Sequence, residues 1–142
     1  MKKTIKSTIS AILIVVCLFT LAACGNTVDK AGLWESATYL KDTEFGEGAK
    51  TVVVEVKAAE QTVTFTINTD KKTVGDALLE HDLIDGDESE YGLYVKVVNG
   101  ITADYDVDKS YWAFYVNGEY ASSGVDTTEI DESAKYQLAY TK

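Results

Sequence analysis

Arginine is absent from this chain of 142 residues, and 13 lysines stand against 23 acidic residues, which gives a net charge of −10. Three of the lysines, Lys2, Lys3 and Lys6, lie in a segment that we expect to be removed. The rest of the chain then carries 10 lysines against 23 acids, a net charge of −13. A surface this acidic repels nucleic acids and anionic lipid headgroups. The composition therefore excludes a nucleic-acid-binding function.

Side chains that commonly perform catalysis are also scarce. The chain has one histidine, two cysteines, no Gly-x-Ser-x-Gly motif and no phosphate-binding loop. The histidine, His81, shares a helical face with Val74, Ala77 and Leu78, where it could cap the helix, bind a metal or sense pH. A structural role is favoured, because no other residue has the spacing of a second metal ligand. We therefore expect that the protein is not an enzyme and requires no cofactor.

Two acidic segments resemble metal-binding loops only in part. The run from Asp104 to Asp108 starts like a calcium loop, but Lys109 stands where such a loop needs glycine, and Tyr115 where it needs glutamate. The acidic residues between Asp82 and Glu90 match no known loop pattern. Solvated acidic loops account for both segments better than calcium binding does, so no metal ligand is predicted.

Residues 1–23 have the pattern of a secretion signal, in which a lysine-rich start precedes the apolar stretch Ala11 to Leu21. That stretch is too short to remain as a membrane-spanning helix. The sequence Leu21-Ala22-Ala23-Cys24 resembles the lipobox of bacterial lipoproteins, where the signal is cut before a cysteine whose thiol carries a diacylglyceryl group. The resemblance implies that acylated Cys24 anchors the protein in the cell membrane, facing outside the cytoplasm. Cys17 would leave with the signal, so the mature chain would have no free thiol.

Beyond Cys24, residues 24–32 are expected to form the lipidated end and a short tether, and residues 33–142 a single domain. Thr51–Lys57 and Thr62–Asn68 alternate apolar and polar residues, which predicts two half-buried strands joined by a hairpin. From Thr73, an expected N-cap, apolar residues recur at helical spacing to about Leu83, before an expected turn at Asp85-Gly86 and an acidic loop.

Further strands are expected at Tyr91–Val98, Tyr111–Val116, Glu119–Ser122 and Ala134–Thr141. Asn-Gly pairs at 99–100 and 117–118 tolerate the positive φ angles of two-residue hairpin turns. The order of elements predicts an α+β protein. We expect a β-grasp-like fold, with one helix packed on a mostly antiparallel sheet.

Aromatic residues are concentrated in the last third of the chain, above all in the strand from Tyr111 to Val116. If Trp112 and Phe114 face the helix, Tyr111 and Tyr115 face outward, and the reverse holds otherwise. An uncovered tyrosine-rich face would suit a flat, partly apolar ligand. Ordinary strand composition explains the same pattern, since tyrosine is common in strands.

The stretch Gly92-Leu93-Tyr94-Val95, Asn99-Gly100-Ile101, Tyr111-Trp112-Ala113-Phe114 and Gly124-Val125 resembles the C-terminal domain of the vitamin B12 carriers transcobalamin and intrinsic factor. It is especially similar to bacterial lipoproteins that carry this transcobalamin-like domain, and that similarity extends from about Trp34 to the end of the chain. The resemblance implies a β-grasp fold that contacts a corrinoid (cobalamin-like) ligand. The helical barrel that completes the carriers' site has no counterpart in this sequence.

By position, the resemblance implies ligand contacts at Tyr91, Gly92, Leu93, Tyr94, Trp112, Phe114, Val116, Asn117, Gly118, Glu119, Tyr120 and Ala121. Asn117-Gly118 and Ser122-Ser123-Gly124 would offer backbone groups to the ligand's edge. We expect a membrane-anchored protein that binds a corrinoid without catalysis, with a transporter or surface protein as a further partner. The alternative is a protein-interaction or surface-display module without a small-molecule ligand, and the sequence does not decide between the two.

Overall fold

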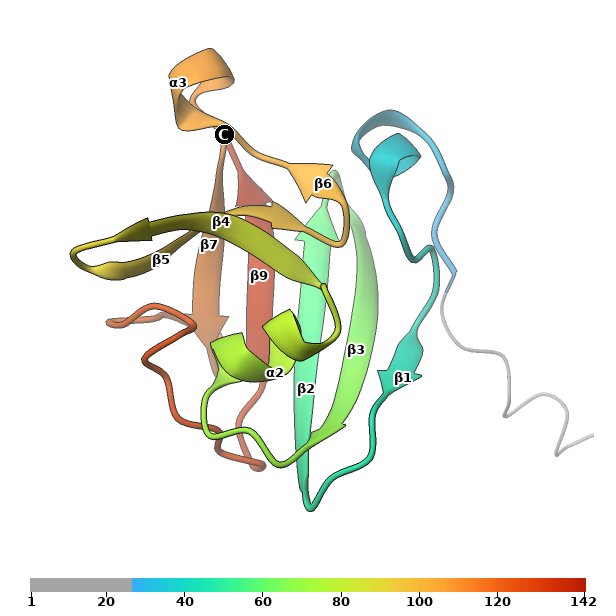
Figure 1. The fold of residues 1–142 in the computed structure, drawn as a ribbon. Coiled ribbons are helices and arrows are strands. Elements are labelled where there is room, and N and C mark those ends of the chain that lie inside the picture. The colour runs from blue at the N-terminus through green and yellow to red at the C-terminus, as the bar shows by residue number, and fades with distance from the viewer. Residues whose placement is uncertain (1–26) are drawn as a thin grey trace, which may run out of the picture.

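The computed structural model describes residues 27–142, so the predictions for the signal segment, Cys17 and Cys24 lie outside the described residues (Figure 1). Two long strands, β2 (Lys50–Ala58) and β3 (Gln61–Thr69), form the expected hairpin. Their alternate apolar residues are buried together with Thr69, and their other threonines lie on the opposite face. The two-residue turn uses positive φ angles at Ala59 (47°) and Glu60 (67°) without a glycine.

Six strands form the main sheet, in the order β1-β3-β2-β9-β7-β8. β9 (Tyr136–Thr141) lies in the middle, parallel to β2 and antiparallel to β7 (Tyr111–Val116). The edges are β1 (Thr43–Phe45), which is parallel to β3, and the short β8 (Glu119–Tyr120). The chain forms a hairpin and a helix, and its final strand, β9, lies beside β2, the first strand of the hairpin. This arrangement confirms the predicted α+β, β-grasp-like architecture.

Helix α2 (Val74–Glu80) begins as predicted and ends earlier than predicted. The Thr73 hydroxyl accepts the backbone N–H of Asp76 at 3.1 Å, as an N-cap does. The expected end at Leu83 was wrong, because Asp82 adopts φ 54° and the Leu83 N–H returns to the Leu78 carbonyl at 3.0 Å. These features form a Schellman motif in which aspartate takes the position usually held by glycine.

A second sheet has three strands, β4 (Ile84–Ser89), β5 (Gly92–Val98) and β6 (Ile101–Thr102), in that order. β4 occupies the segment expected to be an acidic loop, and Asp85-Gly86 is a β-bulge rather than a turn. Both Asn-Gly turns form as predicted, with φ angles of 52° and 77° at residues 99–100 and of 52° and 82° at residues 117–118.

Two short helical segments complete the described chain. The 3-10 helix η1 (Gly32–Ser36) buries Trp34, whose indole N–H donates to the Ala58 carbonyl at 2.8 Å. The one-turn helix α3 (Tyr105–Asp108) lies within the acidic run from Asp104 to Asp108, and the Asp104 carboxylate caps it.

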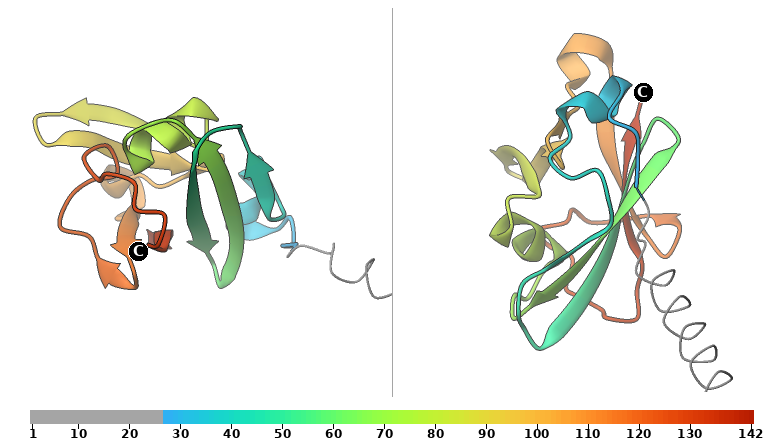
Figure 2. Two further views of the ribbon diagram at one scale, coloured as in Figure 1. Left: turned by 90° about the horizontal axis from the view of Figure 1, so that it is seen from below. Right: turned by 90° about the vertical axis from the view of Figure 1, so that its right-hand side faces the viewer.

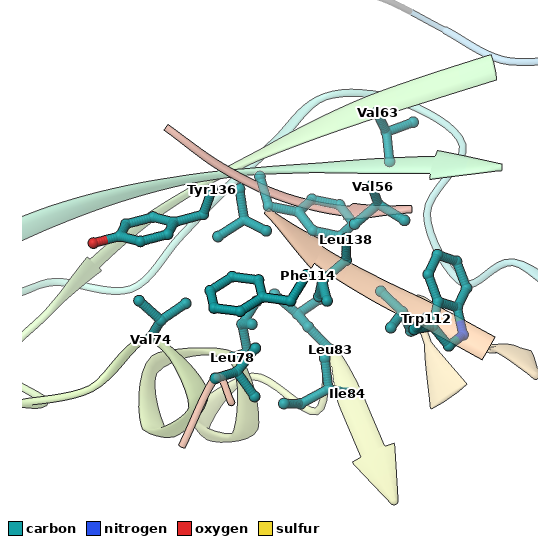
Figure 3. Close-up of a cluster of buried hydrophobic side chains, with 14 of the residues drawn as sticks. Val56, Val63, Val74, Leu78, Leu83, Ile84, Trp112, Phe114, Tyr136 and Leu138 are labelled. Atoms are coloured by element: carbon teal, nitrogen blue, oxygen red, sulfur yellow. The ribbon is translucent and has the colours of Figure 1, made fainter. Parts of the chain in front are cut away.

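The core lies between the main sheet and a second layer made of α2 and the three-stranded sheet (Figures 1 and 2). Val74 and Leu78 of α2 point toward Phe114 and Tyr136, whose rings stack at a centroid distance of 6.1 Å (Figure 3). Trp112 and Phe114 thus face the helix side, and Tyr111 and Tyr115 lie on the other face of β7. Within residues 27–142, no helix is long and apolar enough to cross a membrane.

Contacts of residues 27–29 extend the packed part of the chain to the N-terminal side of residue 33. Thr27 forms a bridge with Lys41, and Val28 is buried, with its N–H bonded to the Leu40 carbonyl at 2.7 Å. The Asp29 N–H donates to the Gln61 side chain at 2.8 Å. The chain therefore reaches the domain at the β1 edge of the main sheet.

Candidate functional site

An open groove of about 580 Å³ lies where β5, β7 and the segment after β8 meet. In Figure 1 the β4–β5 hairpin projects to the left beyond β7, and the orange-red chain that follows β7 lies lower on the same side. Aromatic residues dominate the lining, namely Tyr91, Tyr94, Tyr111, Trp112, Phe114 and Tyr120. Aliphatic residues and a hydroxyl- and glycine-bearing wall complete it: Leu93, Val95, Ala121, Val125, Leu138, Ser122, Ser123, Gly124 and Thr127.

The floor of the groove is rigid. Trp112 and Phe114 are buried, with exposed fractions of 7% and 8%. The Trp112 indole N–H donates to the Ile101 carbonyl at 3.2 Å, and its ring meets Tyr140 edge-on at 5.7 Å. These contacts hold the Trp112 ring in place, so the floor of the groove needs little rearrangement to receive a ligand.

The rim, in contrast, consists of tyrosines that extend into solvent. Tyr91 is 92% exposed and Tyr120 is 66% exposed, and Tyr94 is also exposed. Only Tyr120 has a ring contact, an edge-on approach to Tyr115 at 5.6 Å. Large exposed aromatic side chains around a hollow are typical of binding sites, because they offer area and a polar tip with few rotatable bonds.

The wall formed by residues 121–128 is fixed to the start of α2. The N–H groups of Val74 and Gly75 donate to the carbonyls of Thr128 and Val125, at 2.9 and 2.8 Å. These N–H groups belong to the first turn of the helix, where no partner within the helix exists. A Cβ atom at Gly75 would lie 2.8 Å from the backbone of Asp126, so glycine is needed for this close approach.

Asp126 joins this wall to β5. Its Oδ2 atom accepts the Leu93 N–H at 3.0 Å, and its Oδ1 atom is buried without a hydrogen-bond partner. Gly92 has a φ of 103°, and a Cβ atom there would lie 2.6 Å from Oδ2. Gly92 therefore leaves the space that the carboxylate occupies.

Seven of the twelve residues predicted to contact a ligand line the groove together, namely Tyr91, Leu93, Tyr94, Trp112, Phe114, Tyr120 and Ala121. Gly92 lies behind the wall, against Asp126. Val116, Asn117 and Glu119 line a neighbouring hollow of about 360 Å³, which shares residues 120–123 with the groove. Gly118 lies with Asn117 in a third hollow, beside Glu55 and Gln137.

Five residues that line the groove were not predicted as ligand contacts, namely Val95, Tyr111, Val125, Thr127 and Leu138. A signal existed for some of them. Tyr111 precedes Trp112 in the family-like motif, Val125 closes that motif, and Leu138 alternates with buried Tyr136 in the last strand. Thr127 has no such signal, because only the folding of the 121–128 segment brings it to the groove.

His81 and the acidic segments have structural partners. The His81 ring packs against Phe45 at 5.3 Å, with its Nε2 atom 3.7 Å from a Glu80 carboxylate oxygen. The Ser110 hydroxyl and N–H bond to Asp108, and these bonds lower the pKa of that carboxyl. In the part of the chain that the structure describes, no group of three or more His, Cys, Asp or Glu residues is placed to hold a metal ion.

Residues 71–142 match the family described as "Domain of unknown function (DUF4430)". The chain belongs to this family. Every residue that lines the groove lies inside the DUF4430 region, whereas η1 and β1 to β3 precede it. No curated protein matches the chain.

Several solved structures share the fold. A "putative metal binding protein" from Ruminococcus gnavus ATCC 29149 is 28% identical with a TM-score of 0.62, covering 66% of this chain and 98% of that one. Haptocorrin in complex with Cbi is 20% identical with a TM-score of 0.51, covering 69% of this chain and 26% of haptocorrin. The second similarity is one of fold alone, and it agrees with the transcobalamin-like fold that the sequence motifs implied.

Proposed function

We propose that this DUF4430 protein is an extracytoplasmic lipoprotein that binds a corrinoid in the groove between β5 and β7, without catalysing a reaction. The observation that carries the proposal is the open groove lined mainly by aromatic residues, with Tyr91, Tyr94 and Tyr120 exposed at its rim. The fold similarity to haptocorrin in complex with Cbi supports a corrinoid as the ligand.

The chemistry of the groove fits such a ligand. A corrinoid is a broad, nearly planar macrocycle whose edge carries amides. The exposed rings of Tyr91, Tyr94 and Tyr120 offer apolar area to the ligand, above a floor closed by Trp112 and Phe114. The hydroxyls and backbone groups of residues 122–124 offer hydrogen bonds to its edge. The volume of about 580 Å³ lies within the usual range for small-molecule sites, roughly 300–1,000 Å³.

The groove is open, and this sets the expected affinity. The chain spans only 26% of haptocorrin, so most of that protein has no counterpart here. An open groove contacts one side of the ligand and leaves the other in solvent. We therefore expect micromolar binding, about −8 kcal/mol, rather than picomolar binding at about −16 kcal/mol.

Titration of the full chain, purified in a nonionic detergent, with cobinamide and cyanocobalamin by calorimetry tests this proposal. Tyr120→Ala should weaken binding roughly five- to tenfold, because it removes an aromatic ring from the rim. Tyr105→Ala is the matched control, since Tyr105 is 50% exposed but lies on α3 and does not line the groove. No heat from a folded protein at about 100 µM of either ligand would contradict corrinoid binding and favour the protein-interaction module.

We also propose that acylated Cys24 anchors the chain, on the strength of the lipobox-like sequence before it. The chain enters the domain beside β1, while the groove borders β7 at the other side of the sheet. Strands lie about 4.8 Å apart, so the β1 and β8 edges are roughly 24 Å apart. The groove would thus lie on the far side of the sheet from the attachment point.

Wild-type protein should partition into detergent when expressed in its host, and the Cys24→Ala variant should not. Equal partitioning of the two proteins would contradict the anchor.

The name of the R. gnavus protein raises metal binding as another candidate. No observation within residues 27–142 favours it, because Asp104 and Asp108 bond to the backbone and hydroxyl groups of their own turns. The groove therefore remains the basis of the proposal.

A further inference from the structure

Among residues 27–142, no charged side chain lines the groove. This is unusual for a chain in which 25% of the residues are Asp, Glu or Lys. Only aromatic, aliphatic, hydroxyl-bearing and glycine residues reach the space that a ligand would fill. No lysine in the lining is available to pair with a carboxylate or phosphate of a ligand.

Three lysines that lie near the lining in sequence have partners elsewhere. Lys96 follows Val95, but its ammonium group bonds to Asp87 at 2.7 Å, and this bond raises the pKa of Lys96. Lys142 lies 3.5 Å from Asp108, and Lys109 lies over the Tyr105 ring at 4.8 Å. Their positive charge is thus largely offset or directed away from the groove.

Three carboxylates, in contrast, adjoin the groove without an ion pair among those of the described residues. Glu90 precedes rim residue Tyr91, and Glu119 precedes rim residue Tyr120, and both are exposed. Asp126 lies between two lining residues, Val125 and Thr127, with its Oδ1 atom buried and unpartnered. A buried carboxylate oxygen without a donor projects a negative potential into the nearby space, because no hydrogen bond offsets it.

We infer that the groove selects neutral, amide-edged ligands and rejects anionic ones, with Asp126 and Glu119 as the specificity-determining residues. This inference rests on the proposed corrinoid site and adds the chemical class of the ligand's edge. An amide can accept from the Ser122 and Ser123 region and donate to the tyrosine hydroxyls. A carboxylate in the same place would lose its hydration without gaining a cation, next to charges of the same sign.

Two ligands with the same macrocycle test the inference in calorimetry on the full chain. Dicyanocobinamide carries side-chain amides, and dicyanocobyrinic acid carries carboxylates in their place. We expect the amide form to bind more tightly than the carboxylate form, on the order of a hundredfold at low salt. This ratio of the two dissociation constants should shrink as salt screens the repulsion. Asp126→Asn should lower the ratio of the two dissociation constants roughly three- to tenfold. Asparagine retains an acceptor for the Leu93 N–H but removes the negative charge.

Glu119→Gln gives an independent measure on an exposed position, so the inference stays testable if Asp126→Asn fails to fold. Glu60→Gln is the matched control, since it removes one charge from the exposed turn between β2 and β3. The inference is overturned if the carboxylate form binds within about threefold of the amide form, or if neither Asp126→Asn nor Glu119→Gln changes the ratio. If a folded chain binds neither corrinoid, the proposed function fails and the inference fails with it.

Discussion

At the scale of single residues, the two Asn-Gly turns have the same backbone and different surroundings. Asn99 is 1% exposed, and its side-chain amide makes a pair of hydrogen bonds with the backbone of Tyr39, at 2.9 and 2.8 Å. Asn117 is exposed, and its side-chain oxygen only accepts the Lys135 N–H, at 2.9 Å. The first asparagine thus holds the small sheet to the segment before β1, and the second holds a surface hairpin.

This difference predicts unequal effects of one substitution. Asn99→Asp removes the donor to the Tyr39 carbonyl and buries a carboxylate against it, which should lower the free energy of unfolding by about 2–4 kcal/mol. Asn117→Asp keeps the acceptor and should cost less than about 1 kcal/mol. Urea unfolding of both variants checks this, and equal losses would contradict the assigned role of Asn99.

Residue patterns predicted the Asn-Gly turns and the faces of β2 and β3, because both depend on local backbone preference and on alternation. They did not reveal which tyrosines would be exposed. Tyr136 and Tyr120 have the same side chain, yet one is 1% and the other 66% exposed. That difference comes from the pairing of β9 between β2 and β7, which no local pattern records.

At the scale of elements, the structure departs from prediction where tertiary contacts override local preference. β4 is rich in acidic residues and contains Gly86, so its sequence favours a loop. Its backbone nevertheless pairs with β5 along its length, and Ile84 is buried at its start. The end of α2 was misplaced because the position usually marked by glycine is filled by Asp82.

The bulge in β4 gives a prediction for this element. A Cβ atom at Gly86 would lie 2.0 Å from the Tyr94 carbonyl oxygen, so Gly86→Ala must push β4 away from β5 and displace groove residue Tyr94. We expect a loss of about 2–3 kcal/mol in stability and weaker corrinoid binding.

Gly118→Ala is the control for this change. Gly118 has a φ of 82°, but no atom lies within 4 Å of the Cβ position, so only backbone strain of about 1 kcal/mol is expected, with binding retained. Thermal unfolding and calorimetry on both variants test the comparison. Similar losses of binding would mean that β4 does not position the groove.

At the scale of the whole molecule, the groove depends on parts of the chain outside the DUF4430 region. Its floor is β7, which pairs with β9, and β9 in turn pairs with β2 of the N-terminal hairpin. The hairpin is held at its turn by Trp34 and by the first described residues, through Ala58 and Gln61. The fold class could be predicted from the order of elements, whereas this dependence on residues 27–34 required the three-dimensional structure.

A comparison of two shortened chains tests this dependence. A chain beginning at Thr27 keeps buried Val28 and the bonds between Asp29 and Gln61, and a chain beginning at Leu33 lacks them. We expect the second to be less stable by about 2–4 kcal/mol, from one buried valine and the lost hydrogen bonds. Because about 1 kcal/mol shifts Tm by roughly 4–8 °C in a domain this size, the difference should be measurable in thermal unfolding.

Both cysteines precede Thr27, so reductant should leave the Tm values of both shortened chains unchanged. Equal stability of the two chains would contradict the packing role of residues 27–32, and a drop of more than about 5 °C with chelator would instead reveal a metal that contributes to folding.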